Sequence, residues 1–186
     1  MFRYNLGRLC YTCFMSQDYR FFYRRNLPHF VPKGATLFVT FRLVGSIPVH
    51  VLAELHEESK RLMLQIQEME DGAARREALD REGRRFFGRY DAVLDSAAED
   101  SPQWLNQPDI AQIMAKSMLY WDMKRFSLLV YCIMSNHVHV VFTPLRVDDE
   151  NVALEKIMQG LKGYSAHKAN KILKRKGQFW HHELCP

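Results

Sequence analysis

Apolar and polar residues alternate along residues 36–43, and this pattern predicts a β-strand with one buried face. One face carries Leu37, Val39, Phe41 and Leu43, and the other carries Thr36, Phe38, Thr40 and Arg42. Gly45 and Pro48 then interrupt the alternation and predict the end of the strand.

Apolar residues recur at helical spacing in the next part of the chain. Residues 49–71 are predicted to form a long amphipathic helix through Leu52, Leu55, Leu62, Ile66 and Met69. Residues 72–99 continue in a charged, helical pattern, in which we identify no residue with chemistry of its own. Two further helices are predicted at residues 107–121 and 151–174.

Two strands that lie close together in the sequence predict a hairpin. Residues 126–133 are mostly apolar, residues 134–136 form a turn, and residues 137–143 are the returning strand. Antiparallel strands with helices packed on one face give an α+β fold. The length of 186 residues fits one globular domain, in which we expect residues 49–100 to be a helical insertion.

The net charge of +5 conceals an uneven distribution of charges. Residues 1–44 and residues 155–176 each contain seven Lys or Arg and one acidic residue, whereas the rest of the chain is acidic. Two basic segments that flank an acidic middle favour a track for a polyanion such as nucleic acid, although lysine-rich helix faces can also be simply solvated.

The sequence contains no signal for a membrane. No run of about 18 apolar residues is present, and the N-terminus lacks the apolar core of a signal peptide. We therefore predict a cytoplasmic protein.

Candidate chemistry is concentrated in the returning strand of the hairpin. His137 and His139 are two residues apart, so their side chains project from the same face of a strand and can converge on one divalent metal. Val138, Val140 and Phe142 point the opposite way, into the core. The spacing alone also fits two polar residues on a solvent-exposed face, and it does not identify a third ligand.

The histidine strand resembles the signature strand of the HUH single-strand transposases, and other segments are similar to their REP-associated tyrosine transposase group. The similar segments, in the order of the chain, are residues 26–30 (NLPHF), 34–43 (GATLFVTFRL), 102–105 (PQWL), 109–111 (DIA), 134–141 (MSNHVHVV), 161–166 (LKGYSA), Asn170 and 177–180 (GQFW). The resemblance extends over about residues 19–183. We therefore expect an HUH transposase-like domain at residues 19–176, an N-terminal extension at residues 1–18 and a tail at residues 177–186.

The resemblance implies a fold, a cofactor and a substrate. The fold is a ferredoxin-like or RRM-like antiparallel sheet. His137 and His139 hold Mg²⁺ or Mn²⁺ against a phosphodiester. In such transposases a tyrosine attacks the phosphorus, forms a 5′-phosphotyrosine and releases a 3′-hydroxyl. The substrate is a DNA hairpin with a single-stranded flank. The REP-associated group looks monomeric, so the resemblance favours a monomer.

The chain departs from the family at the nucleophile. The family tyrosine is followed four residues later by Asn or Gln, but none of the eight tyrosines in this chain has that neighbour. We therefore expect that the nucleophile helix is missing and that residues 177–186 are a truncated tail. Tyr164 is the available substitute, although its spacing from Leu154, Ile157 and Leu161 favours core packing.

Three functions remain open at this point. The protein is a nuclease and ligase of single-stranded DNA, a non-catalytic DNA-binding remnant of such an enzyme, or a metal-dependent hydrolase in which water attacks. The residues expected to contact DNA are Arg24, Arg25, Lys33, Arg42, Lys162, Lys168, Lys171, Lys174 and Arg175.

Overall fold

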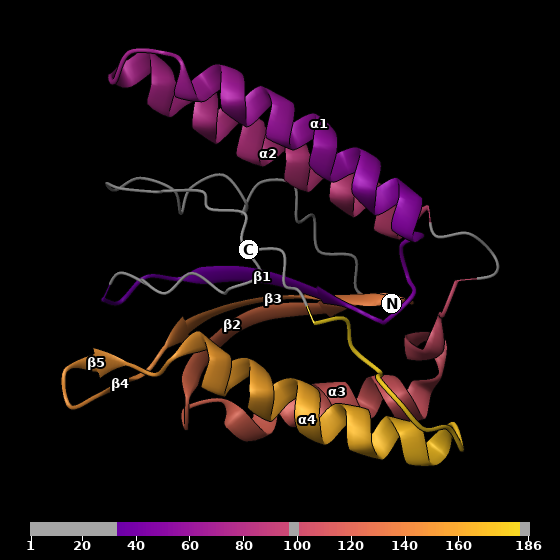
Figure 1. Cartoon of the computed structure of the whole chain (residues 1–186). Helices are drawn as coiled ribbons and strands as arrows, with labels where there is room; N and C mark the ends of the chain where they lie inside the picture. Colours follow the sequence, from indigo (N-terminus) through magenta and orange to yellow (C-terminus); the bar gives the residue numbers. More distant parts are fainter. Residues whose placement is uncertain (1–32, 97–100, 183–186) are drawn as a thin grey trace.

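A three-stranded antiparallel sheet forms the middle layer of the protein (Figure 1). The structure is a computed structural model that describes residues 33–96 and 101–182. In the sheet, β3 (His137–Pro144) lies between β1 (Leu37–Arg42) and β2 (Phe126–Ile133). The predicted extension at residues 1–18 and the end of the predicted tail lie outside the described residues.

The segment after the last helix adds a short fourth position to the sheet. Trp180 forms an antiparallel bridge with Leu43, and the His181 amide donates to the Arg42 carbonyl at 2.8 Å. Residues 179–181 therefore lie next to β1, on the side opposite β3. Apart from the insertion, the chain follows the βαββαβ order of a ferredoxin-like unit, as the resemblance implied.

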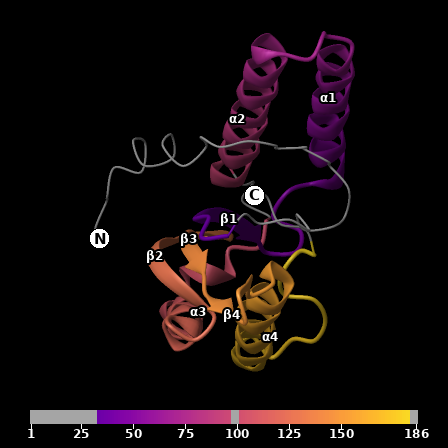
Figure 2. The same ribbon diagram turned by 90° about the vertical axis from the view of Figure 1, so that its left-hand side faces the viewer.

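Helices α3 (Pro108–Trp121) and α4 (Leu154–Ile172) cover one face of the sheet (Figures 1 and 2). The main core lies between them and the apolar side of the strands. Its fully buried side chains include Phe41, Leu43, Ile110, Met114, Met118, Phe126, Val138, Val140, Phe142, Ile157 and Leu161. These residues confirm the predicted apolar faces of β1 and β3.

Helices α1 (Val49–Gln67) and α2 (Ala73–Asp95) form a long antiparallel hairpin over the other face of the sheet (Figures 1 and 2). This hairpin corresponds to the predicted insertion. It has a small core of its own, made of Ile47, Leu55, Phe86, Tyr90 and Leu94. Helix α2 of this hairpin covers the face of the sheet that carries His137 and His139.

Short elements connect the main layers. A 3-10 turn, η2 (Trp104–Asn106), precedes α3, and a two-residue hairpin of β4 (Arg146–Val147) and β5 (Glu150–Asn151) precedes α4. The predicted strand and helix boundaries agree with the structure to within four residues. None of the described helices combines the length and the apolar character needed to cross a bilayer.

Gly160 permits a close approach between α3 and α4. A Cβ atom at this position would lie 3.0 Å from the indole of Trp121 and 3.0 Å from the guanidinium of Arg125. The glycine therefore sits at a tight contact in the helix pair.

The hairpin is tied to the sheet by a buried polar contact. The Arg42 Nε donates to the Tyr90 hydroxyl at 2.9 Å, and both residues are at most 5% exposed. We predict that Tyr90→Phe lowers the free energy of unfolding by about 1–3 kcal/mol, because a buried charged donor loses its acceptor. Urea unfolding followed by circular dichroism measures this change.

The matched control is Tyr120→Phe, since Tyr120 is 59% exposed on α3. This substitution should leave the unfolding free energy within about 0.5 kcal/mol of the wild-type value. Equal effects of the two substitutions would contradict the importance of the Arg42–Tyr90 contact.

Candidate metal centre

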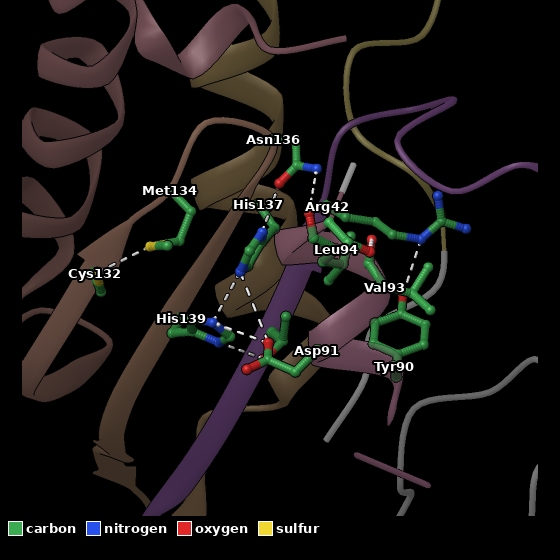
Figure 3. Close-up of polar contacts among 12 residues, drawn as sticks. Arg42, Tyr90, Asp91, Val93, Leu94, Cys132, Met134, Asn136, His137 and His139 are labelled. Atoms are coloured by element: carbon green, nitrogen blue, oxygen red, sulfur yellow. Dashed lines mark hydrogen bonds and ion pairs between the residues drawn. The ribbon is translucent and has the colours of Figure 1, made fainter. Parts of the chain in front are cut away.

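The two strand histidines and one carboxylate from the insertion converge beneath α2 (Figure 3). Alternation along β3 sends Val138 and Val140 into the main core, and it turns His137 and His139 toward α2. Helix α2 supplies Asp91 from its last turns. Three ligand-type atoms, one from each residue, lie within 4.8 Å of one another.

The distances among these three atoms are short. The Nε2 atoms of His137 and His139 are 2.9 Å apart. The Oδ1 atom of Asp91 lies 3.2 Å from His139 Nε2 and 3.8 Å from His137 Nε2. This Oδ1 is buried, and it makes no hydrogen bond of acceptable geometry with any of the described residues. Its contact with His139 therefore has the distance of an ion pair but not the geometry of a hydrogen bond.

The other ring nitrogen of each histidine has its own partner. His137 Nδ1 lies 2.7 Å from Asn136 Oδ1, and His139 Nδ1 lies 2.8 Å from Thr40 Oγ1. The His139 ring also stacks on Phe38, with centroids 5.5 Å apart. Both imidazoles are therefore held so that the two Nε2 atoms point into the cluster with Asp91.

Burial sets the charges of the cluster. It lowers the pKa of His137 to about 4, and the charge of His139 adds to this effect while Asp91 opposes it. Burial alone would raise the pKa of Asp91, but its contact with His139 and the charges of both histidines outweigh burial and lower it. At neutral pH the cluster therefore combines a neutral His137 with an ionised Asp91, which are the states that bind a cation.

The donor set and its spacing fit a divalent metal. Adjacent ligands of an octahedral ion with bonds of about 2.1 Å are about 3 Å apart, and the observed spacings are 2.9, 3.2 and 3.8 Å. The buried Asp91 Oδ1 without a hydrogen bond is an atom that a cation would satisfy. The partners of both Nδ1 atoms give the outer support that metal-binding histidines usually have.

Asp91 is the candidate site residue that the sequence analysis does not identify, because the charged pattern of residues 72–99 predicts a helical insertion with no chemistry of its own. One signal was available: Asp91 lies between Phe87 and Leu94 at helical spacing, so it interrupts an apolar stripe. That signal is ambiguous, however. Glu82 interrupts a neighbouring stripe in the same way, and it is paired with Arg85 at 2.8 Å within the hairpin.

The expectation that Tyr164 packs in the core is wrong. Its side chain is 48% exposed, and the buried face of α4 runs instead through Leu161, Ser165 and Ala169. Tyr164 precedes Ser165 by one residue, so it points about 100° away from that face. Because α4 covers the face of the sheet opposite the histidines, Tyr164 lies across the sheet from the metal-binding atoms (Figure 1).

Three lysines on or just after the last helix are exposed members of the expected DNA-binding set. Lys168, Lys171 and Lys174 are exposed on or just after α4. The Arg175 guanidinium lies 4.1 Å from the centroid of the Trp104 ring, and it donates to Asn170 Oδ1 at 3.0 Å.

The remaining expected DNA contacts in the described residues do not form part of this exposed lysine surface. Lys33 is exposed and pairs with Asp149 at 2.7 Å. Lys162 is partly buried and donates to the His181 carbonyl at 2.8 Å, and burial lowers its pKa to about 8. Arg42 is 2% exposed and is held by Tyr90, so it is withdrawn from the surface that DNA can reach. Arg24 and Arg25 lie outside the described residues.

The lowered pKa of His137 predicts a pH dependence of stability. In the unfolded chain histidine has a pKa near 6.5, so the unfolded state takes up a proton as the pH falls from about 6.5 toward 4, while folded His137 stays neutral. The contribution of His137 to the free energy of unfolding is therefore fully present above about pH 6.5 and decreases as the pH falls below it. We expect a loss of about 2–3 kcal/mol at pH 4.5, measured by urea unfolding in the presence of a chelator.

His137→Gln is the comparison variant, because it removes the titrating group. Its unfolding free energy should change less between pH 7 and pH 4.5 than that of the wild type. The same pH dependence in both proteins would show that other groups cause the loss.

Comparison with protein families gives a match over residues 102–185, to the family described as "Transposase IS200 like". Comparisons with curated proteins and with solved structures found no significant match. The matched segment includes β2, β3 with both histidines, and α4, whereas Asp91 lies outside it. The chain is therefore similar to IS200-like transposases over residues 102–185, which are somewhat less than half of its length.

Proposed function

We propose that this protein binds single-stranded or hairpin DNA and holds a divalent cation with Asp91, His137 and His139. The convergence of these three residues, with two of them inside the segment that matches transposases, is the observation that carries the proposal. The acidic residue comes from the inserted hairpin, and the two histidines come from the central strand.

The ligand set favours Mn²⁺ over Mg²⁺. Two imidazole nitrogens and one carboxylate are a mixed donor set, and Mg²⁺ prefers oxygen ligands. A bound cation supplies polarisation of a phosphodiester and compensation of its negative charge. The chain itself contributes the neutral His137, the ionised Asp91 and the rings of Phe38 and Phe87, which flank His139 and limit water around it.

DNA is proposed to contact the lysines of α4. Lys168, Lys171 and Lys174 are exposed and have no ion pair among the described residues, so their charges are available to phosphates. The Lys162 ammonium reaches the sheet edge at residues 179–181, where it donates to the His181 carbonyl. We expect the protein to act in the cytoplasm as a monomer.

Binding without strand cleavage is the function that we favour. Of the four described tyrosines, Tyr120 is exposed on α3 and Tyr164 is exposed on α4, both across the sheet from the histidines. Tyr131 is opposite Val140 and so lies on the core side of the sheet. Tyr90 lies on the histidine side, but it is 5% exposed and its hydroxyl is bonded to Arg42.

Nicking and rejoining of DNA by a tyrosine is the second candidate function. The family match favours it, because the family is one of transposases. It requires a tyrosine hydroxyl that reaches a phosphate at the metal centre, and a covalent protein–DNA product is its signature.

We predict that Asp91→Asn weakens Mn²⁺ binding more than 100-fold. Loss of an outer partner of a metal ligand typically costs about 10–100-fold, and loss of a direct anionic ligand should cost more. Isothermal titration calorimetry with Mn²⁺ alone measures the affinity without any assumption about catalysis.

Asp95→Asn is the matched control, because Asp95 is one helical turn further along α2 and is not among the three clustered ligands. This variant should retain Mn²⁺ affinity within about threefold. If Asp91→Asn and Asp95→Asn behave alike, Asp91 is not a ligand.

We predict that the protein binds a labelled DNA hairpin with a single-stranded flank in the presence of Mn²⁺, and that this binding slows the migration of the DNA in a native gel. On a denaturing gel the DNA should be intact and should carry no protein. A covalent band that is lost in Tyr164→Phe or Tyr90→Phe would establish the nicking function and overturn binding alone. Cleavage without a covalent band would instead indicate attack by water.

The same DNA tests the α4 surface. Replacing Lys168 and Lys171 by alanine should reduce the salt dependence of binding, by a slope of roughly 0.7 for each phosphate contact that is lost. Lys60→Ala is the control, since Lys60 is exposed on the inserted hairpin. Equal slopes in all variants would place the DNA elsewhere on the protein.

A further inference from the structure

Asn136 lies between the two elements that supply the metal ligands. Its side chain is fully buried at the start of β3. Its Oδ1 atom is 2.7 Å from His137 Nδ1, and its Nδ2 donates to the carbonyl of Leu94 at 2.9 Å (Figure 3). One amide therefore contacts both a ligand on the sheet and the helix that carries Asp91.

The Leu94 carbonyl fixes the orientation of this amide. A carbonyl oxygen only accepts hydrogen bonds, so the NH₂ group of Asn136 must face Leu94 and its oxygen must face His137. An amide oxygen also only accepts, so the proton of neutral His137 is on Nδ1. Nε2 then carries a lone pair and can only accept a hydrogen bond or bind a cation, and it points at His139 and Asp91.

His139 is held in a different way. Its Nδ1 atom meets the hydroxyl of Thr40, and a hydroxyl can donate or accept. This contact orients the ring of His139 without selecting a tautomer. The selection of a tautomer is therefore specific to Asn136 and His137.

The Leu94 carbonyl also belongs to the last turn of α2, which ends at Asp95. The final four carbonyls of a helix have no partner within the helix. Asn136 supplies that partner here, one turn after Asp91. The contact holds the end of the helix that carries the third ligand against the strand that carries the other two.

We propose that Asn136 is a positioning residue for the metal centre, which selects the metal-binding tautomer of His137 and docks the Asp91 helix onto β3. This inference rests on the proposed metal site. It is independent of whether the protein cleaves DNA.

The direct test is the tautomer of His137 in the metal-free protein, read by NMR of histidines labelled with ¹⁵N. The signals are assigned by comparison with His137→Gln. We expect the proton on Nδ1 in the wild type. A proton on Nε2 in the wild type would overturn the proposal without the need for any Asn136 variant.

Two substitutions then separate the contacts. Asn136→Leu has a similar shape but neither hydrogen bond, and it should lose the tautomer preference and weaken Mn²⁺ binding about 10–100-fold. Asn136→Asp keeps an oxygen that accepts from Nδ1, so it should retain the tautomer and lose less affinity. If Asn136→Leu does not fold, a Nε2–H tautomer in Asn136→Asp would overturn the proposal.

Asn170→Leu is the matched control for general destabilisation. Asn170 Nδ2 also donates to a main-chain carbonyl, that of Gly177 at 2.9 Å, and Asn170 Oδ1 also accepts from a side chain, but α4 lies on the other face of the sheet. This variant should leave the His137 tautomer and the Mn²⁺ affinity unchanged.

The outcomes distinguish the two proposals. Wild-type protein that binds no Mn²⁺ would overturn the proposed metal site and this inference together. If the wild type and Asn136→Leu bind Mn²⁺ with the same affinity and have the same His137 tautomer, the proposed role of Asn136 is overturned. The proposed metal site would then stand.

Discussion

The two-residue alternation along β3 is the constraint on which the other features depend. Strand β3 is covered on one face by α3 and α4 and on the other by α2, so each successive side chain must suit a different layer. Val138, Val140 and Phe142 fill the core under α3 and α4, while His137 and His139 face the inserted hairpin. A shift of the strand by one residue would bury the histidines among apolar side chains and would destroy the core and the metal centre together.

Sequence analysis predicted the features that depend on local patterns. The strands, the helices, the hairpin of β2 and β3, and the shared face of His137 and His139 all follow from short-range spacing. The role of Asp91 did not, because it depends on how a helix from an insertion docks across the sheet. The burial of Arg42 was missed for the same reason, since α2 covers what the alternation alone presents as the polar face of β1.

The lysines of α4 and the candidate metal centre lie on opposite faces of the sheet. Lys168, Lys171 and Lys174 are exposed on or just after α4 on one side, and the carboxylate and the imidazoles lie under α2 on the other. A nucleic acid that uses both must pass around the sheet rather than lie across one flat surface. A flexible single strand can follow such a path more easily than a stiff duplex, whose persistence length is about 150 base pairs.

The pairing of β1 with β3 has a consequence for how the chain folds. Arg42 pairs with His137, so this contact closes a loop of more than ninety residues, and contacts of such large sequence separation form slowly. The α1–α2 hairpin within that loop has its own core and can form from local contacts. Asp91 meets His137 and His139 only when the hairpin is docked on the sheet. A cation that binds all three residues, as proposed, would recognise the native state and not the unfolded chain, so its concentration would shift the folding equilibrium by mass action.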